Sequence, residues 1–85
     1  MAYWVYILRS DSTGQYYVGH TGDLDDRVRR HNAGRVTVTR NRGPWQLVHS
    51  EEFPTRAAAA TREQAIKRRK SRAYLSSLCE SRHVG

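Results

Sequence analysis

Several features that define other small proteins are scarce or missing in this sequence of 85 residues. It has one cysteine, Cys79, which excludes a disulfide framework or a cysteine-rich zinc site within the chain and suits a reducing compartment. No apolar run approaches the roughly 20 residues that cross a membrane, and the N-terminus lacks the charged and then apolar form of a signal peptide. We therefore expect a cytoplasmic protein.

The chain is also too short for an extensive interior. A chain of this length buries only about 60–65% of the surface that its unfolded form exposes, so a deep ligand cavity is not expected. Any active site should be shallow, on a face or in a groove. The sequence contains no internal repeat, and it predicts one domain over residues 1–79 followed by a flexible tail over residues 80–85.

Acidic residues are nearly absent from two stretches of the chain. Residues 27–42 contain six arginines and no acid, and residues 62–72 contain six basic residues and one acid, Glu63. The formal net charge is +7, and thirteen of the fifteen basic residues are arginine, whose planar fork grips phosphate oxygens in pairs. These two basic blocks favour a polyanionic partner, of which nucleic acid is the commonest. An anionic membrane surface is the alternative, although the second block lacks the bulky apolar face of an interfacial helix.

Hydrophobic periodicity and turn residues predict an α/β protein of the α+β type, a three-stranded antiparallel sheet flanked by helices in the order β-β-α-β-α-α. The unbroken apolar run over residues 3–8 predicts a central strand. Residues 34–44 have some strand propensity, but their glycine, proline and arginine content favours an ordered basic loop. The other predicted elements are a strand at 16–19, a helix capped by Asp23 and stopped by Gly34, a strand at 45–51 with Trp45, Leu47 and His49 on one face, a helix from Pro54-Thr55 to about Lys70, and a short helix at 72–78.

Aromatic residues gather at the two ends of the segment 4–20. The letters WVY at residues 4–6 open it, and YYVG at 16–19 closes it, with a polar turn between them. Side chains alternate along a strand, so a hairpin centred on that turn places Tyr6 opposite Tyr17, with their phenols side by side. An aromatic cross-strand pair that only stabilises the sheet is the alternative to a catalytic role.

The first predicted helix carries two more candidates for chemistry. Leu24, Val28 and His31 fall at helical spacing and define the stripe that faces the sheet, and Arg27 borders that stripe. An arginine in this position can hold a phosphate, and a histidine can share protons. A solvated arginine and a partly buried, hydrogen-bonded histidine are the structural alternative.

Glu63 is the third candidate, because it is the only acid in a basic helix. It borders the apolar stripe that includes Ile66. A single carboxylate at the rim of a cationic groove suits one Mg²⁺ ion, which keeps most of its waters and accepts one or two carboxylates together with substrate phosphates. The alternative is a surface ion pair with Lys67 one turn away, worth about 0.2–0.5 kcal/mol.

Taken together, these residues resemble a known family. The letters WVY at residues 4–6, ten further residues and then YVG at 17–19, ending on Gly19, look like the paired signature of the GIY-YIG nuclease superfamily. The resemblance covers about residues 3–75 and is strongest to the small, standalone, single-domain bacterial branch. Three later positions are similar to residues of that family: the helical arginine at Arg27, the histidine of some restriction enzymes at His31, and the metal-binding glutamate at Glu63.

The resemblance implies a metal-dependent endonuclease that hydrolyses phosphodiester bonds of DNA with little sequence specificity. It implies that Glu63 holds one Mg²⁺ or Mn²⁺ ion and that Tyr6 is the general base for the attacking water. For that role, nearby cations and the partner phenol of Tyr17 have to lower the pKa of the Tyr6 phenol from about 10. Tyr17 would hydrogen-bond the water or the phosphate, and Arg27 would neutralise the phosphate oxygens. His31 would relay a proton or orient Tyr6.

The sequence also departs from the family pattern. Trp4 stands at the name-giving glycine, His20 stands where DNA-repair members have lysine, and Leu75 stands where repair and restriction members have asparagine. The implied partner is DNA, whether single-stranded, branched or duplex, with no membrane and no organic cofactor. The residues expected to contact the nucleic acid are His20, Arg35, Arg40, Arg42, Lys67, Lys70 and Arg72; His49 and His83 have no expected role.

Two other functions agree with the charge of the chain. One is a nucleic-acid-binding module on the same scaffold without turnover, and the other is a basic protein associated with RNA or the ribosome. Both are indifferent to Glu63, whereas a nuclease requires it.

Overall fold

The computed structural model describes residues 2–69 and 71–81, and in this part of the chain it contains three strands, three α-helices and one turn of 3-10 helix. The predicted fold class and element order are confirmed. The elements are β1 (Tyr3–Ser10), β2 (Tyr16–Thr21), α1 (Leu24–Asn32), η1 (Thr37–Thr39), β3 (Trp45–Phe53), α2 (Arg56–Arg69) and α3 (Arg72–Ser81).

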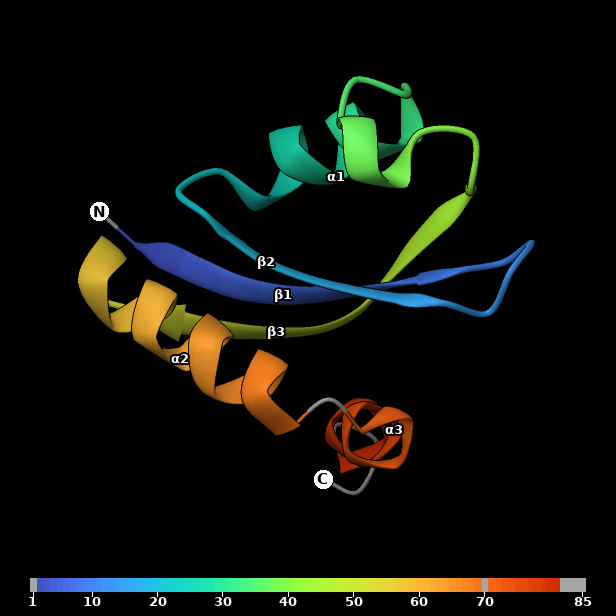
Figure 1. Cartoon of the computed structure of the whole chain (residues 1–85). Helices are drawn as coiled ribbons and strands as arrows, with labels where there is room; N and C mark the ends of the chain where they lie inside the picture. The colour runs from blue at the N-terminus through green and yellow to red at the C-terminus, as the bar shows by residue number, and fades with distance from the viewer. Residues whose placement is uncertain (1, 70, 82–85) are drawn as a thin grey trace.

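The sheet is antiparallel with the strand order β2-β1-β3, so β1 is central and β2 lies at an edge. Helix α1 covers one face of the sheet, and α2 and α3 cover the other (Figure 1). This arrangement explains why the run from Val5 to Leu8 is fully buried, since the strand meets helices on both sides. The sheet therefore separates the helix that carries Arg27 from the helix that carries Glu63.

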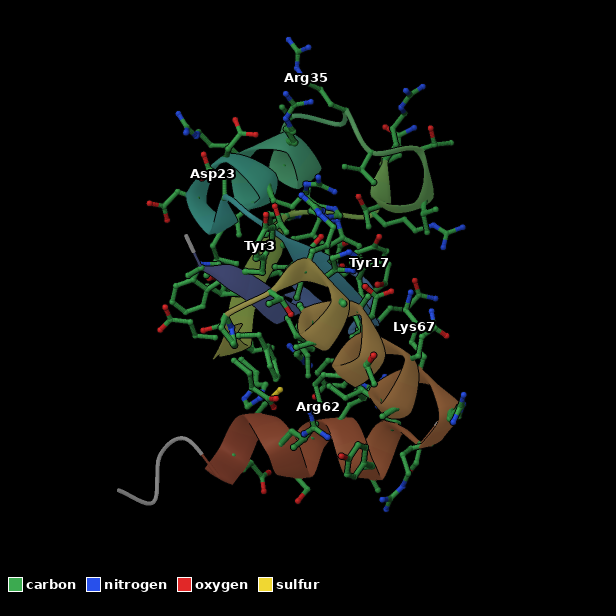
Figure 2. The ribbon with its side chains drawn as sticks, turned by 90° about the vertical axis from the view of Figure 1, so that its left-hand side faces the viewer. Tyr3, Tyr17, Asp23, Arg35, Arg62 and Lys67 are labelled. Atoms are coloured by element: carbon green, nitrogen blue, oxygen red, sulfur yellow. The ribbon has the colours of Figure 1, made fainter. Side chains whose placement is uncertain are left out.

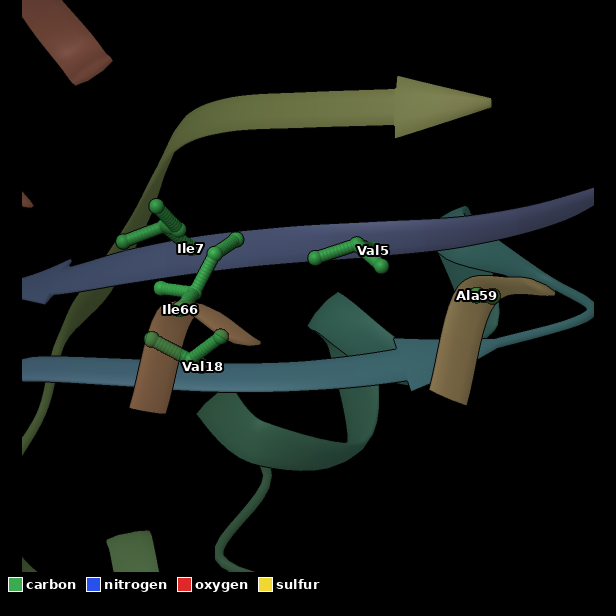
Figure 3. Close-up of a cluster of buried hydrophobic side chains, with 5 residues drawn as sticks. All are labelled: Val5, Ile7, Val18, Ala59 and Ile66. Atoms are coloured by element: carbon green, nitrogen blue, oxygen red, sulfur yellow. The ribbon is translucent and has the colours of Figure 1, made fainter. Parts of the chain in front are cut away.

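Each face of the sheet has its own apolar cluster, as strand alternation requires. The cluster under α2 and α3 contains Val5, Ile7, Val18, Ala59 and Ile66 (Figure 3). The cluster under α1 is built on the alternate residues of β1 and contains the buried side chains of Tyr6 and Leu8, together with Trp45 from β3 and with Leu24 and Val28 packed against them.

Local signals fix α1 as the sequence predicts. The Asp23 side chain caps the helix by accepting a hydrogen bond from the backbone N–H of Asp26 at 3.1 Å. At the other end, Gly34 adopts a φ of 75° and its N–H bonds to the carbonyl of His31 at 3.2 Å. The left-handed conformation favours glycine, so both predicted ends of the helix are confirmed.

The hairpin register differs from the prediction. Tyr6 pairs with Gly19, and Tyr17 pairs with Leu8. The reason is the turn, where the N–H of Ser10 bonds to the carbonyl of Gln15 at 2.9 Å and sets the register one residue later on each strand. Tyr6 and Tyr17 are therefore diagonal neighbours on one face, with ring centroids 6.2 Å apart.

The predicted alternation along β3 is wrong beyond its first residues. Leu8 pairs with Leu47, but the next residue of β1, Ile7, pairs with His49. β3 therefore contains one extra residue, Val48, which forms a bulge. His49 consequently turns to the face of α2, where it is buried, and Leu47 remains 38% exposed.

The last helix is longer than the sequence predicts. Helix α3 extends to Ser81, beyond the predicted end at residue 78, so residues 80 and 81 of the predicted tail are helical. Residues 82–85 lie outside the described part, as do the predicted contact Lys70 and the unassigned His83. No helix in the described residues is long and apolar enough to cross a bilayer.

Candidate functional site at the β2 edge

The centre of the candidate site is the contact between Tyr6 and the backbone of β2. A Cβ atom added to Gly19 would lie 2.6 Å from the Tyr6 hydroxyl oxygen and 2.8 Å from its Cζ. The same atom would lie 3.1 Å from the ring of Tyr17. Glycine is needed at residue 19 because the Tyr6 phenol occupies the space that the Cβ atom of any other residue would fill.

This contact predicts that Gly19→Ala destabilises the fold by about 1–3 kcal/mol, because the Tyr6 ring is buried and has nowhere to move. Chemical denaturation measures the change in the free energy of unfolding. Gly22→Ala is the matched control, since its Cβ would meet only the Tyr3 ring at an ordinary 3.4 Å. Equal stability of the two variants would contradict the proposed packing.

A chain of hydrogen bonds runs from Tyr6 into the protein. The Tyr6 hydroxyl lies 3.0 Å from Nε2 of His31, and Nδ1 of His31 lies 2.8 Å from Oγ1 of Thr39. The Thr39 hydroxyl donates to the carbonyl of Val36 at 3.4 Å, so it accepts from His31. His31 therefore carries its proton on Nδ1, and its Nε2 accepts the proton of Tyr6.

Trp45 fixes the far end of this chain. Its indole N–H donates to the backbone carbonyl of Thr39 at 3.1 Å, which holds η1 against the sheet. Its backbone N–H and carbonyl are both bound by the side chain of Asn32, at 2.7 and 3.1 Å. The orientation of His31 thus depends on β3 and η1 as well as on α1.

Burial controls the protonation of this pair. Burial, and then the charge of Arg27, lowers the pKa of His31 to about 4. Burial also raises the pKa of Tyr6 far above its ordinary value, and the neighbouring Tyr17 adds to this rise. The charge and hydrogen bonding of Arg27 act in the opposite direction without overcoming it. The expectation that cations lower the pKa of Tyr6 is therefore wrong for the free protein.

The lowered pKa of His31 predicts a pH-dependent stability. As the pH falls below 6.5 the unfolded chain takes up a proton at His31, whereas the folded protein does so only near pH 4. The free energy of unfolding should therefore fall through this window by up to about 3 kcal/mol. Urea denaturation at a series of pH values measures it. His31→Gln should remove this part of the pH dependence, and an unchanged profile would contradict it.

Glu63 lies on the other face of the sheet and reaches the same edge strand. Its carboxylate is within 2.6 Å of Nδ1 of His20, the residue after Gly19, and within 2.6 Å of Nζ of Lys67. Burial acts to raise the pKa of Glu63, but the hydrogen bonds and charges of Lys67 and His20 outweigh it and hold the pKa below its ordinary value. Glu63 is thus a buried, ionised carboxylate that makes the ion pair with Lys67 described by the alternative and a second contact with His20.

Glu63 and Tyr6 meet β2 at neighbouring residues, since Glu63 contacts His20 and the Tyr6 phenol lies against Gly19. Arg27 is the cation whose charge and hydrogen bond act on Tyr6, and His20 and Lys67 contact Glu63 on the other face of the sheet. Among the predicted site residues, the structure therefore gathers these groups around two successive residues of β2.

The donor set around Glu63 suits a hydrated divalent ion held by one carboxylate. The described residues contain no group of three or more histidine, cysteine or acidic side chains that could hold a metal. A single ionised carboxylate fits Mg²⁺ or Mn²⁺ when waters and substrate phosphates complete the shell. At least one of the two present partners of the carboxylate, His20 or Lys67, has to make room for such an ion.

The other predicted contacts lie on both sides of the sheet. Arg35, Arg40 and Arg42 are exposed in the segment between α1 and β3, and Nε of Arg40 donates to the carbonyl of Gly34 at 3.0 Å. Lys67 belongs to α2, and Figure 2 shows it beside the edge marked by Tyr17 and well separated from Arg35. Arg72, the remaining predicted contact, is exposed at the start of α3, and its guanidinium lies over the ring of Tyr16.

Two features of the site were missed by the sequence analysis. Thr39 is the second partner of His31, but its position in an irregular segment gives no signal of this contact. The direct contact between His20 and Glu63 was missed as well, although the predicted alternation along β2 puts His20 on the face of Val18. Packing the Val18 face of the sheet against the predicted long helix that carries Glu63 would have suggested this contact.

Comparison with known proteins identifies the family of the chain. The family model described as the GIY-YIG catalytic domain matches residues 2–75, which is most of the chain. The chain therefore belongs to the GIY-YIG nuclease superfamily.

Its relatives are small single-domain proteins. It is 50% identical over 66 residues to UPF0213 protein HQ_3675A of Haloquadratum walsbyi, covering 76% of this chain and 73% of that protein. It is 40% identical over 75 residues to UPF0213 protein lin0209 of Listeria innocua, covering 84% and 82%. The fold is similar to the solution NMR structure of UPF0213 protein BH0048 from Bacillus halodurans, with a TM-score of 0.58, 36% identity and coverage of 94% of this chain and 84% of that one.

Proposed function

We propose that the protein is a metal-dependent endonuclease that hydrolyses phosphodiester bonds of DNA with little sequence specificity. One observation carries the proposal: a buried, ionised carboxylate and a phenol hydrogen-bonded to a histidine meet the edge strand at successive residues, His20 and Gly19. A scissile phosphate at this edge would have a general base on one side and a metal ligand on the other. Membership of a nuclease family supports the same conclusion.

The hydrogen-bond chain supplies a route for the proton of the attacking water. Because the pKa of Tyr6 is raised, the phenol is neutral in the free protein and donates to Nε2 of His31. We propose that Tyr6 accepts a proton from water while it passes its own proton to His31. The water then attacks phosphorus as hydroxide, its proton rests on the imidazole, and the bond to the leaving oxygen breaks, after which that oxygen takes a proton from solvent water. The negative charge of a phosphate beside His31 would offset the lowering of the His31 pKa by the charge of Arg27.

Glu63 is the proposed ligand of one Mg²⁺ or Mn²⁺ ion, with His20 positioned by its other oxygen. Such an ion, when bound, stabilises the negative charge that develops on the phosphate and leaving oxygen. Lys67, released from Glu63, is free to hold a neighbouring phosphate. Tyr17, whose ring centroid lies 6.2 Å from that of Tyr6, is the proposed hydrogen-bond partner of the water or the phosphate.

Arg27 is the proposed clamp on the phosphate oxygens, and Arg27→Lys tests it. Lysine keeps the charge but lacks the fork that binds two oxygens, so we expect cleavage to fall by about 10- to 100-fold. Arg29→Lys on the exposed side of α1 is the matched control and should retain activity. Single-turnover cleavage rates measure both variants; equal rates would remove Arg27 from the reaction.

A nucleic-acid-binding module without turnover is the second candidate. One observation favours it: in the free protein, one oxygen of the Glu63 carboxylate is bound by His20 and the other by Lys67, so neither is open to a metal ion. The net charge of +7 suits either function.

The proposal is tested by a cleavage panel of single-stranded, duplex, flap and junction DNA and of RNA, with Mg²⁺ or Mn²⁺ and with a chelator. We expect metal-dependent cleavage of at least one DNA form, with binding that weakens as salt rises because the contacts are to phosphates. Binding of every form without cleavage would favour the second candidate. Tight binding of RNA alone would support the RNA-associated function.

A further inference from the structure

A shallow groove of about 260 Å³ lies directly beside the candidate site. It crosses the exposed edge of the sheet between β2 and the two helices on the far face. Its lining comes from three elements and is mostly apolar: Tyr16, Tyr17, Val18, Ile66, Lys67 and Leu75.

The groove is continuous with the residues around Tyr6. Tyr17 belongs to both, since its ring lies 4.8 Å from that of His31 between centroids. Lys67 also belongs to both, since its Nζ lies 2.6 Å from the carboxylate of Glu63. Figure 2 shows Tyr17 and Lys67 on the same side of the molecule.

The walls of the groove suit a flat, aromatic ligand. Val18 and Ile66 are buried and form an apolar floor, and the two tyrosines are only half-buried. Apolar walls with a few polar groups at the margin are typical of sites for small planar molecules. Purines and pyrimidines stack on aromatic side chains whatever their sequence.

Cations lie at the margins of the groove. Lys67 is one, and the guanidinium of Arg72 lies over the ring of Tyr16 at 5.4 Å from its centroid. No acidic side chain lines the groove itself among the described residues. A ligand that combines an apolar ring with a negative group complements this surface better than a neutral apolar one.

We propose that the groove binds one nucleobase, that of the nucleotide next to the phosphate held at the β2 edge. The inference rests on the proposed function for the presence of that phosphate, and it adds a base subsite formed by Tyr16, Leu75 and the floor beneath them. A base can enter only when it is unstacked from its neighbours. The groove therefore favours single-stranded or locally opened nucleic acid over regular duplex.

The test compares two probes of equal length and charge in the presence of a chelator, so that no cleavage occurs. One is a fluorescent oligothymidylate, and the other carries abasic sugars in place of the bases. By fluorescence anisotropy, the protein should bind the oligothymidylate about 5- to 10-fold more tightly. Tyr16→Leu should abolish this preference.

Tyr74→Leu is the matched control, because Tyr74 is also half-buried with an arginine, Arg69, over its ring at 4.1 Å, yet it does not line the groove. This variant should keep the preference for bases. Leu75→Trp, which fills the groove from α3, is a second variant that should lose it. Thermal unfolding establishes that each variant is folded.

Equal binding of the two probes by the unchanged protein would overturn the inference, and so would a preference that survives in both groove variants. Its failure is distinguishable from that of the proposed function. Base preference without cleavage in Mg²⁺ would leave the groove and refute the nuclease. Cleavage without base preference would leave the nuclease and refute the groove.

Discussion

Replacing Glu63 by glutamine is expected to reduce metal-dependent cleavage by at least about 1000-fold. Glutamine keeps the shape of the side chain and can still accept a hydrogen bond from His20, but it has no charge with which to hold a divalent ion. The contact of the carboxylate with Lys67 at 2.6 Å also loses its ionic character. Single-turnover cleavage at saturating protein measures the effect on the chemical step, and isothermal titration with Mn²⁺ measures the expected loss of metal binding.

Glu51→Gln is the control that the chain itself offers. Glu51 is also a partly buried carboxylate on the α2 side of the sheet, held by Arg62 at 2.8 and 3.1 Å and by His49 at 2.7 Å. Its substitution should lower stability without removing cleavage, because its contacts join α2 to β3, at the opposite edge of the sheet from β2. If the two variants lose cleavage equally, Glu63 acts only through stability.

Tyr6→Phe is the second substitution with a large expected effect. It removes one oxygen and leaves the ring against Gly19, so we expect cleavage to fall by about 100- to 10,000-fold while affinity for DNA is retained. Stability should fall by about 1–2 kcal/mol, because Nε2 of His31 is left buried without its donor. Cleavage rates, anisotropy and chemical denaturation measure the three quantities.

Tyr3→Phe is the control for the loss of a phenol from the same strand. Tyr3 is half-buried beneath Arg56, whose guanidinium lies 4.8 Å from the ring centroid, and it lies outside the hydrogen-bond chain of His31. This variant should cleave as the unchanged protein does. A Tyr6→Phe protein that also cleaves normally would show that the base is elsewhere.

The parts of the structure that the sequence predicts well are those set by local chemistry. Asp23 and Gly34 mark the ends of α1 because a cap and a left-handed glycine act within a few residues. The apolar run of β1 identifies a central strand for a similar reason, since only burial on both faces favours it. Helix packing was predictable to the extent that Leu24, Val28 and His31 share a stripe.

The missed features depend on contacts between distant segments. The turn that pairs Tyr6 with Gly19, and the bulge that turns His49 to the face of α2, follow from hydrogen bonds that residue types do not specify. The partnership of His31 and Thr39 requires η1 to be held by Trp45. The pKa of Tyr6 was predicted in the wrong direction because the depth of burial could not be inferred from neighbouring charges.

The central claim is spatial: Glu63 and the pair Tyr6–His31 act on one phosphate from the two sides of β2. Paramagnetic broadening by Mn²⁺ in the NMR spectrum of the protein tests it directly. Substoichiometric Mn²⁺ should broaden the ring resonances of Tyr6, Tyr17 and His31, and Glu63→Gln should restore them. Broadening confined to other acids, such as Asp25 at the start of α1, or unaffected by the loss of the Glu63 charge, would contradict the claim.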